Sequence, residues 1–105
     1  MQMDRDISPD GRGKYILINQ RKLATRPRTA EELAAAILAN PEAVEFGTTG
    51  SENEFFLIKL KDRYAQEALH AYAGAASEHD TEWAAAVDRL AERAGPASPY
   101  CKLPD

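Results

Sequence analysis

One stretch limits the folds open to this chain more than any other: Glu54–Lys61, which runs directly into Asp62. Its apolar residues occupy both sets of alternating positions, with Phe56, Ile58 and Leu60 in one set and Phe55 and Leu57 in the other. Successive side chains of a strand point to opposite faces, so both faces of this segment would be apolar. The pattern therefore predicts an inner strand, or a strand covered by a second chain.

Helical periodicity and turn residues divide the rest of the chain into further elements. We predict a strand at Tyr15–Ile18, a helix from Thr29 to Asn40, a strand at Ala43–Phe46, a helix from Arg63 to about Ala76 and a helix from Asp80 to Gly95. Thr29, Asp62 and Asp80 are predicted N-caps, because their side-chain oxygens can accept hydrogen bonds from free amides of the next turn. Thr29 and Glu32 match a capping box, in which Glu32 would bond back to the Thr29 amide.

The turn-rich segment Gly47–Asn53 should return the chain as a hairpin into Glu54–Lys61. The order strand, helix, strand, strand, helix, helix predicts an α+β fold, with a small three-stranded sheet packed against three helices. We expect residues 1–13 to form a flexible N-terminal arm, residues 14–96 a single α+β domain and residues 97–105 an extended C-terminal tail. The tail should pack through Tyr100 and Leu103, on its own domain or on a neighbouring subunit.

The charge of the chain is unevenly distributed. The 105 residues carry a net charge of −4, which argues against general nucleic-acid binding. Residues 11–30 nevertheless hold six bases and no acid, so the rest of the chain carries −10. No apolar run approaches the length of about 20 residues that a membrane span needs. The single cysteine excludes an intrachain disulfide framework, and we expect a cytoplasmic protein that does not bind membranes.

The main candidate site is the basic connector, Arg21–Arg28, together with the helix start that follows it. Its residues are Arg21, Lys22, Arg26, Arg28 and Thr29. Free amides at a helix N-terminus attract phosphate or carboxylate, and arginine can hold such a group with two parallel hydrogen bonds. The alternative is a solvated loop whose bases pair with the acidic helices. Glu31 and Glu32, which already complement the helix start, favour that alternative.

The remaining chemistry-bearing residues suggest no catalytic, metal or cofactor site. His70 and His79 lack metal-ligand spacing, and a pairing of either with Cys101 is conceivable without being indicated by the pattern. Tyr64, Tyr72, Trp83 and Tyr100 could line a pocket for a planar ligand, but their helical spacing favours core packing. Strands apolar on both faces in so short a chain predict a homo-oligomer, with Phe55 or Leu57 at its interface.

The C-terminal half resembles small uncharacterised proteins of bacteriophage and prophage genomes. The resemblance covers Glu54–Asp105 and is carried by Leu60–Ala65, Ala71–Ala73, Arg93–Pro96 and Cys101–Asp105. It implies a phage accessory role, such as interference with a host defence system by binding a host protein or sequestering a nucleotide signal. It transfers no active-site residues.

Three functions remain open from the sequence. The first is a non-catalytic small binding protein that takes a host protein or a nucleotide-like anion. The second is a small enzyme acting on a phosphorylated or nucleotide substrate, which the missing nucleophile–base and paired-carboxylate spacings disfavour. The third is a structural or assembly protein.

Overall fold

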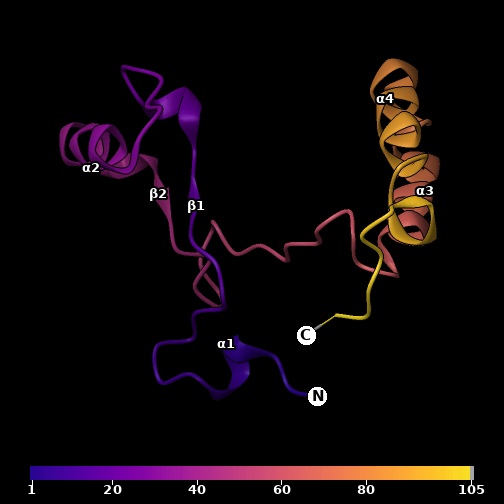
Figure 1. Ribbon diagram of the computed structural model, residues 1–105, viewed down its shortest axis with the longest axis horizontal. Coiled ribbons are helices and arrows are strands. Elements are labelled where there is room, and N and C mark those ends of the chain that lie inside the picture. The colour runs from indigo at the N-terminus through magenta and orange to yellow at the C-terminus, as the bar shows by residue number, and fades with distance from the viewer. Residues whose placement is uncertain (105) are drawn as a thin grey trace. The chain divides into compact units, whose positions relative to one another are not determined.

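The computed structural model describes residues 1–104 and divides into two compact units (Figure 1). The first unit is Met1–Phe56, and the second begins at Leu57. The limits predicted for the arm, the domain and the tail stay predictions.

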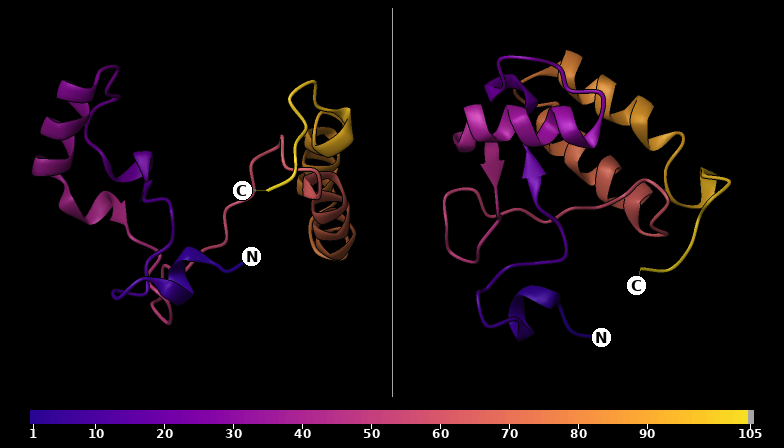
Figure 2. Two further views of the ribbon diagram at one scale, coloured as in Figure 1. Left: turned by 60° about the horizontal axis from the view of Figure 1, so that its bottom comes forward. Right: turned by 60° about the vertical axis from the view of Figure 1, so that its left-hand side comes forward.

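The first unit is built around one helix and a two-stranded antiparallel sheet. The sheet joins β1 (Leu17–Ile18) to β2 (Val44–Glu45), with Leu17 opposite Glu45 and Ile18 opposite Val44. The right-hand view of Figure 2 shows these strands side by side, with α2 (Ala30–Ala39) close to them. Two short 3-10 turns, η1 (Gln20–Lys22) and η2 (Pro41–Ala43), complete the connections.

The start and the end of α2 follow from its sequence. The Thr29 hydroxyl accepts from the Glu32 amide at 3.1 Å, as predicted for the N-cap. The Glu32 carboxylate instead accepts from the Arg28 amide at 2.7 Å, so the reciprocal bond predicted to the Thr29 amide is wrong by one residue. Asn40 caps the C-terminal end, because the Pro41 ring cannot continue the helix.

The predicted three-stranded sheet packed against three helices is wrong. Residues 1–104 contain four α-helices and a two-stranded sheet, and Glu54–Lys61 is not a strand. A strand needs a partner for its carbonyls, and here several of them have other donors. The Phe55 carbonyl accepts from Arg5, and the Leu60 carbonyl accepts from the Gly95 amide at 2.7 Å.

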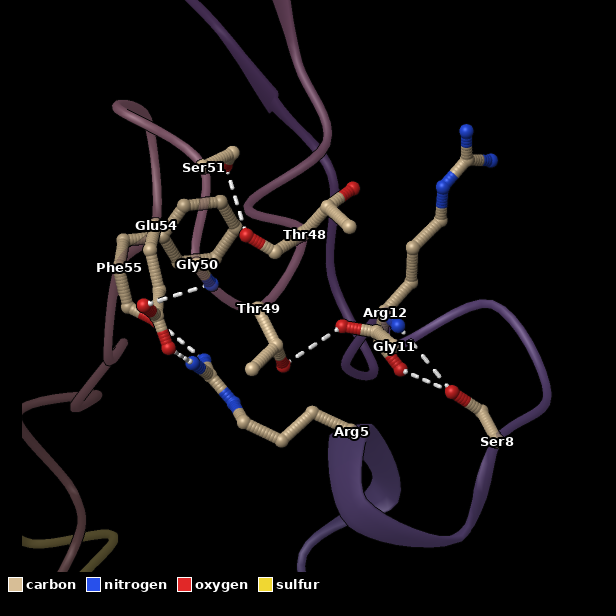
Figure 3. Close-up of polar contacts among 10 residues, drawn as sticks. All are labelled: Arg5, Ser8, Gly11, Arg12, Thr48, Thr49, Gly50, Ser51, Glu54 and Phe55. Carbon is tan, nitrogen blue, oxygen red and sulfur yellow. Dashed lines mark hydrogen bonds and ion pairs between the residues drawn. The ribbon is translucent and has the colours of Figure 1, made fainter.

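The N-terminal segment is fastened to the loop that follows β2 (Figure 3). It contains one helical turn, α1 (Asp4–Ile7), from which Arg5 reaches Glu54 in an ion pair of 2.7 Å and also bonds the Phe55 carbonyl. Farther along, the Gly11 carbonyl accepts from both the amide and the hydroxyl of Thr49, each at 3.0 Å. We call these contacts the N-terminal clasp.

A polar turn next to the clasp fixes the backbone of residues 8–12. Asp10 accepts from the Arg12 amide at 3.1 Å and from the Ser8 hydroxyl at 3.0 Å. Both bonds favour the carboxylate, so they hold the pKa of Asp10 below its ordinary value, the Arg12 amide contributing most. The Arg12 guanidinium also lies 4.0 Å from the centre of the Phe46 ring.

The second unit is a helical hairpin. It consists of α3 (Ala65–Ala76) and α4 (Thr81–Ala91), which lie side by side, as the right-hand view of Figure 2 shows. Asp80 caps α4 by accepting from the Trp83 amide at 2.9 Å, as predicted. Asp62 does not cap α3: it accepts from the Tyr64 amide at 2.8 Å, and Tyr64 takes the capping position without a side-chain bond.

The C-terminal tail is held by its main chain. The Lys102 amide donates to the Lys61 carbonyl, and the Lys102 carbonyl accepts from the Arg63 amide, both at 2.9 Å. Tyr100 is 76% exposed and Leu103 is 58% exposed, so within this chain the predicted packing through these two side chains is wrong. The α4 helix ends at Ala91, before the predicted stop, and Gly95 opens a further 3-10 turn, η3 (Gly95–Ala97).

The core of each unit consists of small side chains. The buried apolar residues are Ala36, Ala43, Ala65, Ala73, Ala84, Val87, Ala91 and Ala94. Within residues 1–104, no large side chain is fully buried. The hydrophobic stabilisation of each unit is therefore small, because burial contributes in proportion to the apolar area removed from water.

Candidate functional site

The basic connector folds as a 3-10 turn followed by an irregular segment that leads into α2. Asn19 caps the turn by accepting from the Arg21 amide at 3.1 Å, which places Arg21 and Lys22 within the turn. The Arg26 guanidinium donates to the Gln20 side chain at 3.3 Å, so the segment folds back on the turn. Arg28 then lies directly before the capping residue Thr29. All five predicted site residues are solvent-exposed.

An open hollow of about 350 Å³ lies where the connector meets α2. It is lined by Ile18, Gln20, Pro27, Arg28, Thr29, Ala30 and Leu33. The structure thus brings Arg28 and Thr29 to the hollow. Arg26 lies beside it through its bond to Gln20. Neither Arg21 nor Lys22 is among the lining residues.

The charged groups near the hollow include the basic side chains of the connector and an acid, Glu32, in the first turn of α2. Arg21, Lys22, Arg26 and Arg28 form no ion pair with any residue in 1–104. The alternative from the sequence, a solvated loop whose bases pair with the acidic helices, stays a prediction: the loop is exposed, and the ion pairs described within residues 1–104 do not include these bases. Glu32 contacts the main chain of Arg28, which leaves the Arg28 guanidinium unneutralised. Its carboxylate nevertheless adds negative charge beside the hollow.

The hollow also contains residues that the sequence analysis did not identify. Ile18 and Leu33 supply an apolar floor, and Gln20 supplies a polar group that positions Arg26. The only sequence signal for Gln20 was its place just before the two bases Arg21 and Lys22. Ile18 reaches the hollow because β1 leads directly into the 3-10 turn, a connection that requires knowledge of the fold.

The second unit holds a histidine–carboxylate contact that spacing along the sequence did not reveal. His70 Nδ1 lies 3.1 Å from Asp88 Oδ1, across α3 and α4. Both side chains are 56% exposed, and neither is bonded to a serine or cysteine among the described residues. The same part of the chain contains no cluster of three or more possible metal ligands. Cys101 is a free thiol.

The aromatic residues do not form the core that their spacing predicted. Tyr64, Tyr72 and Trp83 are 55%, 54% and 53% exposed, respectively. Trp83 Nε1 donates to the Tyr72 hydroxyl at 3.2 Å, so these two rings share one side of the hairpin. None of the three lines the hollow beside α2.

Comparisons with protein-family models, curated proteins and solved structures found no match for this chain. The helices described within residues 1–104 are all too short or too polar to cross a membrane.

Proposed function

We propose that this chain is a non-catalytic small binding protein that takes a nucleotide-like anion at the hollow beside the start of α2. The observation that carries the proposal is the set of four connector cations without an ion-pair partner in residues 1–104. Phosphate is the group best suited to such a site, because charge-assisted bonds from arginine are short and directional.

The shape of the hollow supports a ligand with an apolar as well as a charged part. Ile18, Pro27 and Leu33 offer apolar contacts, while Arg28 and the first turn of α2 offer positive charge. A base or another flat ring attached to a phosphate combines these two properties. The Glu32 carboxylate disfavours a highly charged anion, since it lies at the same helix start.

The proposal is tested by a thermal-shift panel of linear and cyclic nucleotides, with inorganic phosphate alone as the smallest probe. A ligand that binds the folded state raises the melting temperature with increasing concentration. Exchange of Arg28 for glutamine should weaken the best ligand by about 1.5–3 kcal/mol, the contribution of one charged hydrogen bond. Lys61→Gln, which removes one charge from the second unit, is the matched control and should leave affinity unchanged.

The double variant Arg26→Gln/Arg28→Gln should lose binding further while keeping its fold, because exposed charges contribute only about 0–1 kcal/mol to stability. Retained affinity in this variant would refute the site. Recovery of the ligand unchanged after long incubation distinguishes sequestration from turnover by a small enzyme.

A phage accessory role, in which the protein removes a nucleotide signal or binds a host factor, is the biological setting that we propose with this function. It rests on the resemblance of the C-terminal half to phage proteins. We also propose that the protein self-associates in the cytoplasm, because its units bury so few large apolar side chains.

A further inference from the structure

The two faces of the helical hairpin differ in chemistry. Where α3 and α4 meet, the contact is made by buried Ala65, Ala73, Ala84, Val87 and Ala91. Beside this contact, apolar side chains repeat at helical spacing: Tyr64, which directly precedes α3, with Ala68 and Tyr72 in α3, and Trp83, Ala86 and Leu90 in α4. All of them except Ala68, which precedes the half-buried Leu69, stand one position before a buried residue. The Trp83–Tyr72 hydrogen bond places both series on the same side. We call this surface the apolar face.

The opposite face of the hairpin is polar. Asp88 follows the buried Val87 and His70 follows the half-buried Leu69, and their 3.1 Å contact joins the helices on that side. Each helix therefore has a wide apolar arc, of which the hairpin buries only one half. Tyr64, Tyr72 and Trp83 remain 53–55% exposed on the other half. An arc of this width is typical of a helix that packs against two neighbours rather than one.

Charge along α4 indicates what covers this face. The helix carries Glu82 in its first turn and Arg89 in its last turn, with Arg93 one turn farther on. None of these three side chains forms an ion pair with a residue in 1–104. Helical spacing sets Glu82 along the border of the apolar face, and Arg93 lies in the turn that follows the end of α4. A second α4 packed antiparallel would place its bases beside this acid, whereas a parallel one would place like charges together.

We propose that two copies of the chain pair their apolar faces, antiparallel, to form a four-helix bundle. The two-fold axis runs perpendicular to the helices, so that α3 packs on the partner copy's α3 and α4 packs on its α4. Such an isologous contact uses one self-complementary patch and closes as a dimer. The anion site lies in the first unit and is not needed for this contact.

The size of the patch determines the strength expected of the dimer. A fully covered aromatic side chain buries about 150–250 Å², so three half-exposed aromatics leave about 200–400 Å² to cover in each copy. Specific stable interfaces bury about 1,200–2,000 Å² in total. The aromatic side chains of both copies together therefore supply about 400–800 Å², below the lower end of that range, and the bordering charges and the smaller residues Ala68, Ala86 and Leu90 add to this area. We therefore expect a reversible dimer with a Kd of about 1–100 μM.

Sedimentation velocity on the full chain over about 1–500 μM, a range that spans the expected Kd, tests the proposal. The parent should shift from monomer to dimer with concentration. Tyr72→Lys should raise the Kd at least tenfold, since central aromatic residues dominate such interfaces (about tenfold per hot spot or more). His70→Lys, two residues away on the polar face, is the matched control and should dimerise like the parent. Circular dichroism confirms that both variants retain their helices.

A pair of charge-reversal variants provides a second test of the dimer if the Tyr72→Lys variant does not fold. Arg93→Glu should weaken the dimer, and adding Glu82→Arg to it should restore dimerisation by re-forming the pair with the opposite sign. A parent that stays monomeric throughout the range overturns the proposal, as does equal dimerisation of Tyr72→Lys and His70→Lys. Nucleotide binding by a monomeric parent would separate this failure from that of the anion site.

Discussion

The N-terminal clasp gives a quantitative test of how the first unit is held together. Replacing Arg5 by glutamine removes the charge that contacts Glu54 and the donor to the Phe55 carbonyl. The Arg5 side chain is 16% exposed and that of Glu54 is 39% exposed. A charged hydrogen bond contributes about 1.5–3 kcal/mol and an exposed ion pair about 0–1 kcal/mol. The intermediate exposure predicts a loss of about 1–2 kcal/mol for the clasp.

Hydrogen exchange measures this loss where it occurs. Amides that open locally exchange faster as the opening free energy falls, and about 1–2 kcal/mol corresponds to a 5- to 30-fold change. The increase should be confined to the amides fixed by the clasp, including Thr49 and Gly50, which donate to Gly11 and Glu54. Arg21→Gln is the control, because its side chain has no ion-pair partner in residues 1–104.

A double-mutant cycle tests whether Arg5 and Glu54 interact directly. Arg5→Gln and Glu54→Gln should each speed exchange, and the double variant should be less affected than the sum of the two. Unchanged exchange at Thr49 and Gly50 in Arg5→Gln, or strict additivity in the cycle, would refute the reasoning. The Arg5–Glu54 contact would then contribute nothing to the stability of the first unit.

Two further outcomes can be measured by urea or thermal unfolding. Gly47→Ala should lower the free energy of unfolding by at least about 1–2 kcal/mol, the cost of a left-handed backbone with a side chain, because Gly47 has φ +64° and an added Cβ would meet the Phe55 ring. Gly50→Ala, where φ is +81° and the space around the added Cβ is open, should lose only the backbone contribution. Equal losses in the two variants would contradict the contact with the Phe55 ring. Truncation after Cys101 should lower the free energy of unfolding by about 1–3 kcal/mol, because it removes the two main-chain hydrogen bonds of Lys102. Tyr100→Ser and Leu103→Ser should each change it by less than about 0.5 kcal/mol. A larger loss in these substitutions than in the truncation would show that the tail packs through its side chains.

The helices could be predicted because their signals are local. Thr29 and Asp80 cap α2 and α4 through bonds that span three residues, and Asn40 followed by Pro41 ends α2. Asp62 had the same chemistry and failed as a cap. Its carboxylate bonds the Tyr64 amide two residues on, which forms a tight turn in place of the first helical turn. Residue type alone does not distinguish these two outcomes.

Whether Glu54–Lys61 forms a third strand could not be determined from its own sequence. An alternating apolar pattern describes which faces a strand would have, but a strand exists only if another segment supplies the opposite ladder. Here the Phe55 carbonyl accepts from Arg5 and the Leu60 carbonyl from Gly95, one donor far before and one far after the segment. The Phe55 and Leu57 interface predicted from the same pattern loses its basis for the same reason.

The candidate site was partly predictable. Arg26, Arg28 and Thr29 are neighbours in the chain, so their charge and capping chemistry can be seen in the sequence. The hollow itself requires β1 to meet the start of α2, which brings Ile18 to Leu33 across fifteen residues. Likewise, the periodicity of Trp83 and Tyr72 indicated an apolar face, but not that the hairpin would leave it half exposed.

The alanine-rich core connects the two proposals. Burying a large apolar side chain contributes about 1.5–3 kcal/mol, and no such side chain is fully buried in residues 1–104. A partner that binds only the folded state adds to the free energy of unfolding, and this addition is a larger fraction of the total when the unit itself is weakly stabilised. A ligand beside α2 would stabilise the first unit, and a second copy on the apolar face would stabilise the second. The melting temperature should therefore rise with nucleotide and with protein concentration as two separate effects, and Tyr72→Lys should remove only the second.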